Sequence, residues 1–194
     1  MIFMENQELI SHKGYIRQCI KNICGIQNVV FCKRSYAEAE KDCIHVRFPD
    51  NLDYEYVMHA YADAIHEAFH LRYKTHLVCE EARKVRKDNK LNPKLFYPLS
   101  NSIEDYRVNK LGEFDFPGES HVLMLSMRLR ARNTSLKNVE TLLHLELHGF
   151  NYNHGVKFDL NKIKTAKELA IGVVDLGYSE IANIMKECYN IVYL

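Results

Sequence analysis

Two histidines and a glutamate stand together in the order His66-Glu67-Ala68-Phe69-His70. On an α-helix, residues four positions apart lie one above the other, so His66 and His70 can direct two imidazole nitrogens at one point. Such a pair suits zinc, whose bonds to histidine nitrogen are about 2.0–2.1 Å long. Glu67 lies beside the first histidine and can reach water at the metal without binding the metal, as a general base must. The spacing therefore predicts two ligands and a base for zinc-assisted hydrolysis.

A catalytic zinc site needs a third protein ligand and leaves a fourth position for water. Glu104 lies on a second expected helix, and a helix packed across the first would bring its carboxylate to the metal. Asp105 is the neighbouring alternative, and His121 is the next. Glu104 also has an interpretation without metal, in which Asn101 caps the second helix and Glu104 folds back onto the cap in a capping box.

The helix face that carries His66 and His70 also carries His59 and Asp63. A polar stripe on a helix with many apolar neighbours favours a buried polar role, and Asp63 is a candidate for orienting a ligand imidazole. The alternative is a solvated stripe that contains a histidine–aspartate pair.

The combination His66-Glu67-x-x-His70 and Asn101-x-x-Glu104-Asp105-x-Arg107 resembles the zincin metallopeptidases whose third ligand is a glutamate on a later helix. It is similar, more narrowly, to metallopeptidase-like segments of phage and bacterial proteins, in which a Glu-Asp-x-Arg stretch follows the His-Glu-x-x-His helix. Some of these segments stand beside von Willebrand A domains in cobaltochelatase-type subunits. The resemblance covers residues 55 to 110.

This resemblance implies a division of roles among the motif residues. His66, His70 and Glu104 would bind Zn²⁺, and Glu67 would be the catalytic base. The implied substrate is a protein or peptide. Asp105 and Arg107 would be supporting residues. Apart from the resemblance, the mechanism also needs a donor for the oxyanion, for which the candidates are Tyr106, Arg107, His121 and His144.

Two other classes of function remain open from the residues alone. One is a catalytically silent zinc-binding interaction module on a zincin scaffold, and the other is a helical binding protein without metal. A second histidine pair, His144 and His148, also stands at i and i+4, but its glutamate is in the middle position. We expect that pair on a partly exposed helix face.

The elements around the motif predict an α+β fold, a mostly helical, zincin-like single domain over residues 1–194. Segments rich in β-branched and aromatic residues predict a small sheet near residues 28–49, packed on the helix that carries the motif. That helix should begin after an Asp53 cap, and the helix containing Glu104 should end near Gly112. The helices are expected at residues 7–24, 54–76, 100–112, 119–148 and 162–190, the last with a possible break at Gly177, and the strands at 28–34 and 43–49.

Composition limits the partners and the location. The formal net charge is +1, which gives no electrostatic argument for nucleic acid or an anionic membrane. The N-terminus lacks the apolar core of a signal peptide, so we expect a cytoplasmic protein with reduced cysteines. The six cysteines include no Cys-x-x-Cys pair, which disfavours a zinc ribbon or a thioredoxin-like redox site.

Overall fold

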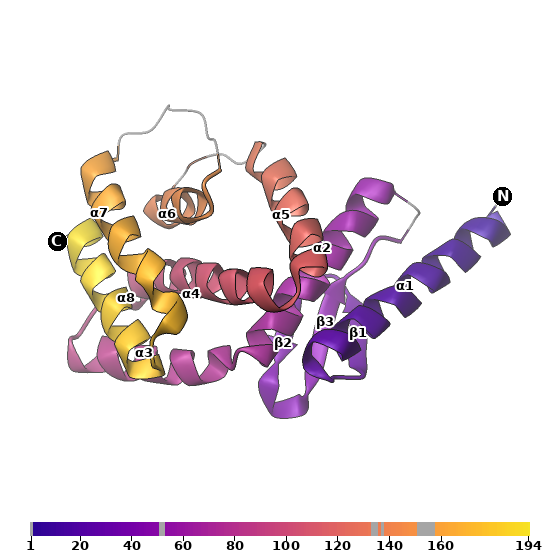
Figure 1. The fold of residues 1–194 in the computed structure, drawn as a ribbon, viewed down its shortest axis with the longest axis horizontal. Coiled ribbons are helices and arrows are strands. Elements are labelled where there is room, and N and C mark those ends of the chain that lie inside the picture. Colours follow the sequence, from indigo (N-terminus) through magenta and orange to yellow (C-terminus); the bar gives the residue numbers. More distant parts are fainter. Residues whose placement is uncertain (1, 51–52, 133–135, 137, 151–157) are drawn as a thin grey trace. The chain divides into compact units, whose positions relative to one another are not determined.

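The computed structural model describes residues 2–50, 53–132, 136, 138–150 and 158–194. The chain is mostly helical with one three-stranded sheet, which confirms the α+β class (Figure 1). It forms two compact units, Met1–Tyr73 with Gly112–Met127, and Lys74–Leu111 with Arg128–Leu194. The single zincin-like domain stays a prediction. Within the described ranges, no helix is both long and apolar enough to cross a bilayer.

The first unit combines two helices with the sheet. The helices are α1 (Ile2–Cys24) and α2 (Tyr54–Arg72), and the strands are β1 (Asn28–Cys32), β2 (Tyr36–Glu38) and β3 (Cys43–Arg47). The two expected strands are therefore present at β1 and β3. The strand β2 was not expected, because the polar residues between the two predicted strands favour a solvated connection or a helical turn. The short 3-10 helix η1 (Ala39–Lys41) agrees with the second of these.

The side chains of the central strand β3 divide between the two faces of the sheet. The central strand β3 pairs in parallel with β1 and antiparallel with β2. Successive side chains of a strand alternate between faces, so the buried Ile44 and Val46 lie on one face of β3, while Cys43 and His45 lie on the other. Helix α2 packs against β2 and β3, which confirms that the sheet packs on the helix that carries the motif.

Asp53 caps the start of α2, as expected. Its carboxylate accepts hydrogen bonds from the backbone amides of Glu55 and Tyr56, which satisfies donors that the first helical turn leaves without partners. The helix ends at Arg72 rather than at residue 76. Lys74 then takes a left-handed conformation with φ of 54°, so a separate helix starts at Thr75.

The second unit is helical. Its elements are α3 (Thr75–Asp88), α6 (Val139–His148), α7 (Leu160–Ala170), η2 (Ile171–Asp175), α8 (Tyr178–Tyr193) and parts of α4 (Pro93–Asp115) and α5 (Pro117–Arg132). Helix α8 packs against both α3 and α7 (Figure 1). Buried side chains of these helices form the core of the unit, with Phe96, Leu142 and Ile181 among the largest.

Helix α4 differs from its predicted bounds at both ends. It begins at Pro93, contains Pro98 and continues through Gly112 to Asp115. Asn101 therefore lies well inside the helix, and the interpretation of Asn101 and Glu104 as a capping box is wrong. Gly112 does not end the helix. It packs against the ring of Phe69 in the first unit, where a side chain would not fit.

Candidate metal centre

His66 and His70 face each other on α2, and their Nε2 atoms are 3.1 Å apart. The two rings meet edge to face, with centroids 4.5 Å apart. Two histidine ligands on a tetrahedral zinc ion have nitrogens about 3.3 Å apart, given bonds of about 2.0–2.1 Å. The pair thus has nearly the separation that zinc requires. The same distance also suits a hydrogen bond between two neutral imidazoles.

Packing around Phe69 positions the histidine-bearing turn of α2. Phe69 is fully buried, and its ring lies 6.0 Å from that of Phe116. Farther along, the hydroxyl of Tyr73 donates a hydrogen bond of 3.0 Å to Asp115. The apolar side of the turn is therefore fixed on the segment that follows Gly112, and the half-buried His66 and His70 lie on other sides of the helix.

Glu67 is half-buried and directly follows the first histidine on α2. Asp63, one turn before His66, accepts a hydrogen bond of 3.1 Å from the hydroxyl of Ser35. That hydroxyl also accepts a bond of 2.9 Å from the backbone amide of Arg47 in β3. Asp63 therefore connects α2 to the sheet, whereas its role in orienting an imidazole stays a prediction.

Glu104 lies in the second unit and is only 2% exposed. Arg107 donates to both of its carboxylate oxygens, from Nε to Oε2 at 2.8 Å and from Nη2 to Oε1 at 2.6 Å. The hydroxyl of Thr75, at the start of α3, donates to Oε1 at 2.6 Å. These contacts fix the orientation of the carboxylate. Oε2 accepts one hydrogen bond from the described residues, so it keeps a lone pair that can bind a cation.

The other predicted residues of the second motif have different surroundings. Asp105 accepts a hydrogen bond of 3.0 Å from the side-chain amide of Asn101. Tyr106 is buried in the core of the second unit, with its ring centroid 5.7 Å from that of His148. His148 is itself buried and stacks on Phe150, so the prediction of a histidine pair on a partly exposed face of α6 is wrong for His148.

A cavity of about 380 Å³ lies within the second unit, and Glu104 forms part of its wall. The hydroxyl of Ser100, also in the wall, is buried without a hydrogen-bond partner among the described residues. Most of the remaining lining is apolar or weakly polar, with Arg83 as its basic side chain. The full lining is Val78, Cys79, Ala82, Arg83, Tyr97, Ser100, Asn101, Glu104 and Met185.

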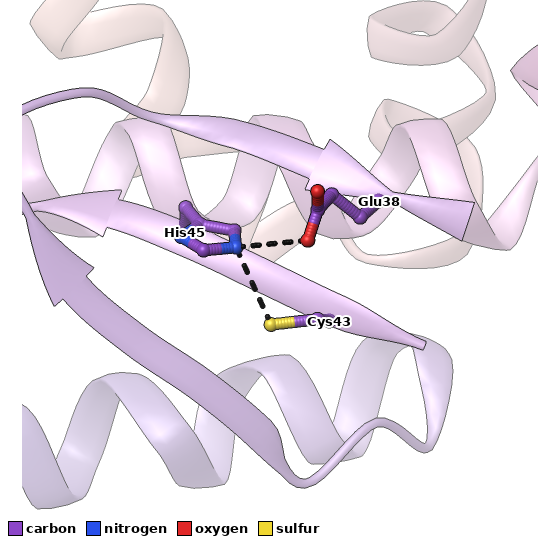
Figure 2. A group of neighbouring side chains, drawn as sticks. All are labelled: Glu38, Cys43 and His45. Carbon is purple, nitrogen blue, oxygen red and sulfur yellow. Dashed lines mark hydrogen bonds and ion pairs between the residues drawn. The ribbon is translucent and has the colours of Figure 1, made fainter. Parts of the chain in front are cut away.

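Sequence analysis missed a second group of possible ligands, Glu38, Cys43 and His45, which lie together on the sheet (Figure 2). The available signal was the alternation Cys43-Ile44-His45, which places a thiol and an imidazole on one face of a strand. The contribution of Glu38 depends on the pairing of β2 with β3, which the sequence did not predict.

Comparisons with known proteins found no relative of this chain. No protein-family profile matches the chain, and neither a curated protein nor a solved structure matches it.

Proposed function

We propose that this protein is a zinc-dependent hydrolase, specifically a metallopeptidase that cleaves a protein or peptide in the cytoplasm. The observation that carries the proposal is the 3.1 Å separation of the His66 and His70 Nε2 atoms on one helix. Two imidazoles at this spacing, with a glutamate directly after the first, match the needs of a zinc hydrolase in ligand type and in sequence order.

Glu104 is the proposed third ligand, from the resemblance to zincins whose third ligand is a later glutamate. Metal-binding carboxylates are commonly held by hydrogen bonds from neighbouring side chains. The bonds that Glu104 accepts from Arg107 and Thr75 support the proposal in this sense, because they fix the side chain and leave a lone pair on Oε2. Asp105 is the alternative carboxylate.

The chemistry proposed for these residues is amide hydrolysis. Zinc, when bound, supplies Lewis acidity that acidifies water and polarises a carbonyl. Glu67 accepts the proton of the attacking water and transfers it to the leaving amine. The α2 helix keeps His66 and His70 one turn apart, which holds their imidazole nitrogens close together. Tyr106 and Arg107 are proposed to stabilise charge in the transition state or to support the residues that do.

The contacts of Glu104 also favour a second candidate, a zinc-binding module without catalytic activity. The ion pair with Arg107 and the bond from Thr75 would by themselves account for a buried glutamate at this position. In that case the α2 histidines would bind metal while the chain serves to hold a partner.

The deciding experiment replaces Glu67 with Gln, which keeps the shape of the side chain but removes the base. Peptide libraries are first screened for cleavage that chelators suppress and zinc restores. Glu67→Gln should keep the zinc bound to the histidine pair and lose at least the roughly 10²- to 10⁴-fold that general acid–base catalysis supplies.

Glu55→Gln is the matched control, because Glu55 lies in the exposed first turn of the same helix. It should keep full activity. Unchanged cleavage in Glu67→Gln would exclude Glu67 as the base. Zinc binding without any chelator-sensitive cleavage would favour the catalytically silent module instead.

A further inference from the structure

Glu38, Cys43 and His45 share one face of the sheet in the first unit (Figure 2). Cys43 and His45 are two positions apart in β3, so their side chains point to the same side. Glu38 is the direct partner of Cys43 in the antiparallel pairing with β2, which adds its side chain to that face. Tyr36 and Val30 lie on the same face with 41% and 40% of their surface exposed, so solvent reaches this side of the sheet.

The three side chains converge on one nitrogen of His45. Its Nε2 atom is 3.1 Å from Glu38 Oε2 and 3.6 Å from Cys43 Sγ, and the donor atoms all lie within 4.8 Å of one another. Around tetrahedral zinc, ordinary bond lengths place a nitrogen about 3.4 Å from an oxygen and about 3.5 Å from a sulfur. The observed separations are close to both values.

The other nitrogen of His45 has its own partner. Nδ1 lies 3.9 Å from the sulfur of Cys32, which donates its proton to the backbone carbonyl of Arg34 at 2.9 Å. The sulfur of Cys32 therefore presents a lone pair to Nδ1, which favours the tautomer with hydrogen on Nδ1. Nε2 then directs a lone pair toward Glu38 and Cys43, where a cation would be stabilised.

We infer that Glu38 Oε2, Cys43 Sγ and His45 Nε2 form a zinc site on the sheet, distinct from the histidine pair of α2. A sulfur ligand favours zinc over magnesium or calcium, which bind through oxygen. Three protein ligands leave a fourth tetrahedral position for water or an external ligand. This site does not depend on the proposed hydrolase.

Neighbouring side chains hold His45 and Glu38 in position. The ring of His45 stacks on Tyr36, with centroids 4.2 Å apart and planes within 6° of parallel. Lys41 pairs with Glu38 through Oε1 at 3.2 Å, so Oε2 remains directed at His45.

A disulfide between Cys32 and Cys43 does not explain the group. In the parallel pairing of β1 with β3, Cys43 is opposite Asn28 and Cys32 is opposite Arg47. Four residues of strand separate those positions by about 13 Å, well beyond the roughly 7 Å that a disulfide spans between Cα atoms.

The remaining explanation is an ion pair between protonated His45 and Glu38. It needs no sulfur, so Cys43 distinguishes it from a metal site. Titration of the whole chain with Co²⁺, a common substitute for zinc, should produce a thiolate-to-cobalt charge-transfer absorption. The proposed α2 site has no cysteine, so this absorption reports on the sheet site. It should disappear in Cys43→Ser and His45→Ala and persist in Cys79→Ser, whose thiol is exposed.

A second measurement needs no substitution. The zinc-loaded, unaltered protein should show a zinc–sulfur distance of about 2.3 Å by X-ray absorption spectroscopy, because the proposed sheet site includes a thiolate ligand. Loss of a ligand should weaken Co²⁺ binding by more than the roughly 10- to 100-fold typical of a lost supporting residue. Absence of the thiolate band in the unaltered protein, its survival in Cys43→Ser, or the lack of a zinc–sulfur distance in the zinc-loaded protein would each overturn the site.

Discussion

Gly112 of α4 lies directly against the ring of Phe69 on α2, so closely that a Cβ atom at Gly112 would overlap three atoms of that ring. Phe69 is fully buried and immediately precedes His70. The absence of a side chain at Gly112 therefore determines how the histidine-bearing turn of α2 packs within the first unit.

Gly112→Ala is expected to destabilise the protein, although alanine favours a helix. Overpacking a core typically costs about 1–3 kcal/mol, which exceeds the gain of up to about 1 kcal/mol from replacing a helical glycine. Chemical denaturation measures the difference. Phe69→Leu in the same chain should recover part of the loss by making room for the new methyl group.

Gly14→Ala is the matched control for this substitution. Gly14 lies inside α1, and a Cβ atom there would meet nothing within 4 Å. Its replacement should stabilise the protein by about 0.5–1 kcal/mol. Equal effects of the two substitutions would contradict the close packing of Gly112 on Phe69.

His66→Ala and His70→Ala should each abolish tight zinc binding at α2, because one imidazole alone provides only half of the pair. The substitutions are made in a Cys43→Ser background so that the sheet site does not contribute. Isothermal titration with zinc measures the affinity. His121→Ala, on an exposed part of α5, should bind zinc as the background does. Loss of binding there would instead make His121 a ligand.

The role of Glu104 can be separated from its ion pair. Glu104→Gln alone removes the carboxylate from the buried pair that Glu104 forms with Arg107, and removing one member of a buried pair costs about 3–5 kcal/mol. Glu104→Gln with Arg107→Met removes both charges and should recover much of that stability. If Glu104 binds zinc, the double variant still loses zinc affinity, whereas unchanged affinity would limit Glu104 to a structural role.

Asp105→Asn tests the neighbouring carboxylate. If Asp105 only supports a zinc ligand, removing its charge should lower the zinc affinity roughly 10- to 100-fold. A loss as complete as that of His66→Ala would instead identify Asp105 as the third ligand. Thermal unfolding without metal checks that the hydrogen bond from Asn101 is not the source of the change.

Cys188 should resist alkylation in the folded protein. Its thiol is fully buried and donates to the carbonyl of Ala166, and burial raises its pKa to about 12. Because only the thiolate reacts, labelling at pH 8 should reach the exposed Cys79 well before Cys188. Timed labelling with mass spectrometry measures the order, and denaturant should remove the difference. Equal rates without denaturant would contradict the burial of Cys188.

Local signals predicted the elements that local chemistry controls. The Asp53 cap and the strands at β1 and β3 follow from residue type and spacing within a few positions. Features that depend on distant residues were missed. The sequence around Gly112 suits the end of a helix, whereas in the structure the glycine lies inside α4 and makes room for the ring of Phe69, a residue 43 positions earlier in the chain.

In the candidate sites, too, local spacing could be predicted from the sequence and contacts between distant residues could not. His66 and His70 could be paired from sequence because one helical turn joins them, and the structure places their nitrogens 3.1 Å apart. The polar segment between β1 and β3 gave no strand signal, so Glu38 could not be placed opposite Cys43. Likewise, the bond from Thr75 to Glu104 joins α3 to α4 and could not be predicted from local sequence, whereas Arg107 lies one turn from Glu104 on the same helix.

The division of the chain has a consequence for synthesis on the ribosome. Helix α2 belongs to a unit that also needs Gly112–Met127, while the intervening Lys74–Leu111 belongs to the other unit. A nascent chain that has reached Tyr73 lacks both Gly112, on which Phe69 packs, and Ser126, the partner of His59. The histidine-bearing helix can therefore complete its packing only after most of α5 has emerged, and a fragment that stops at Tyr73 would expose Phe69 to water.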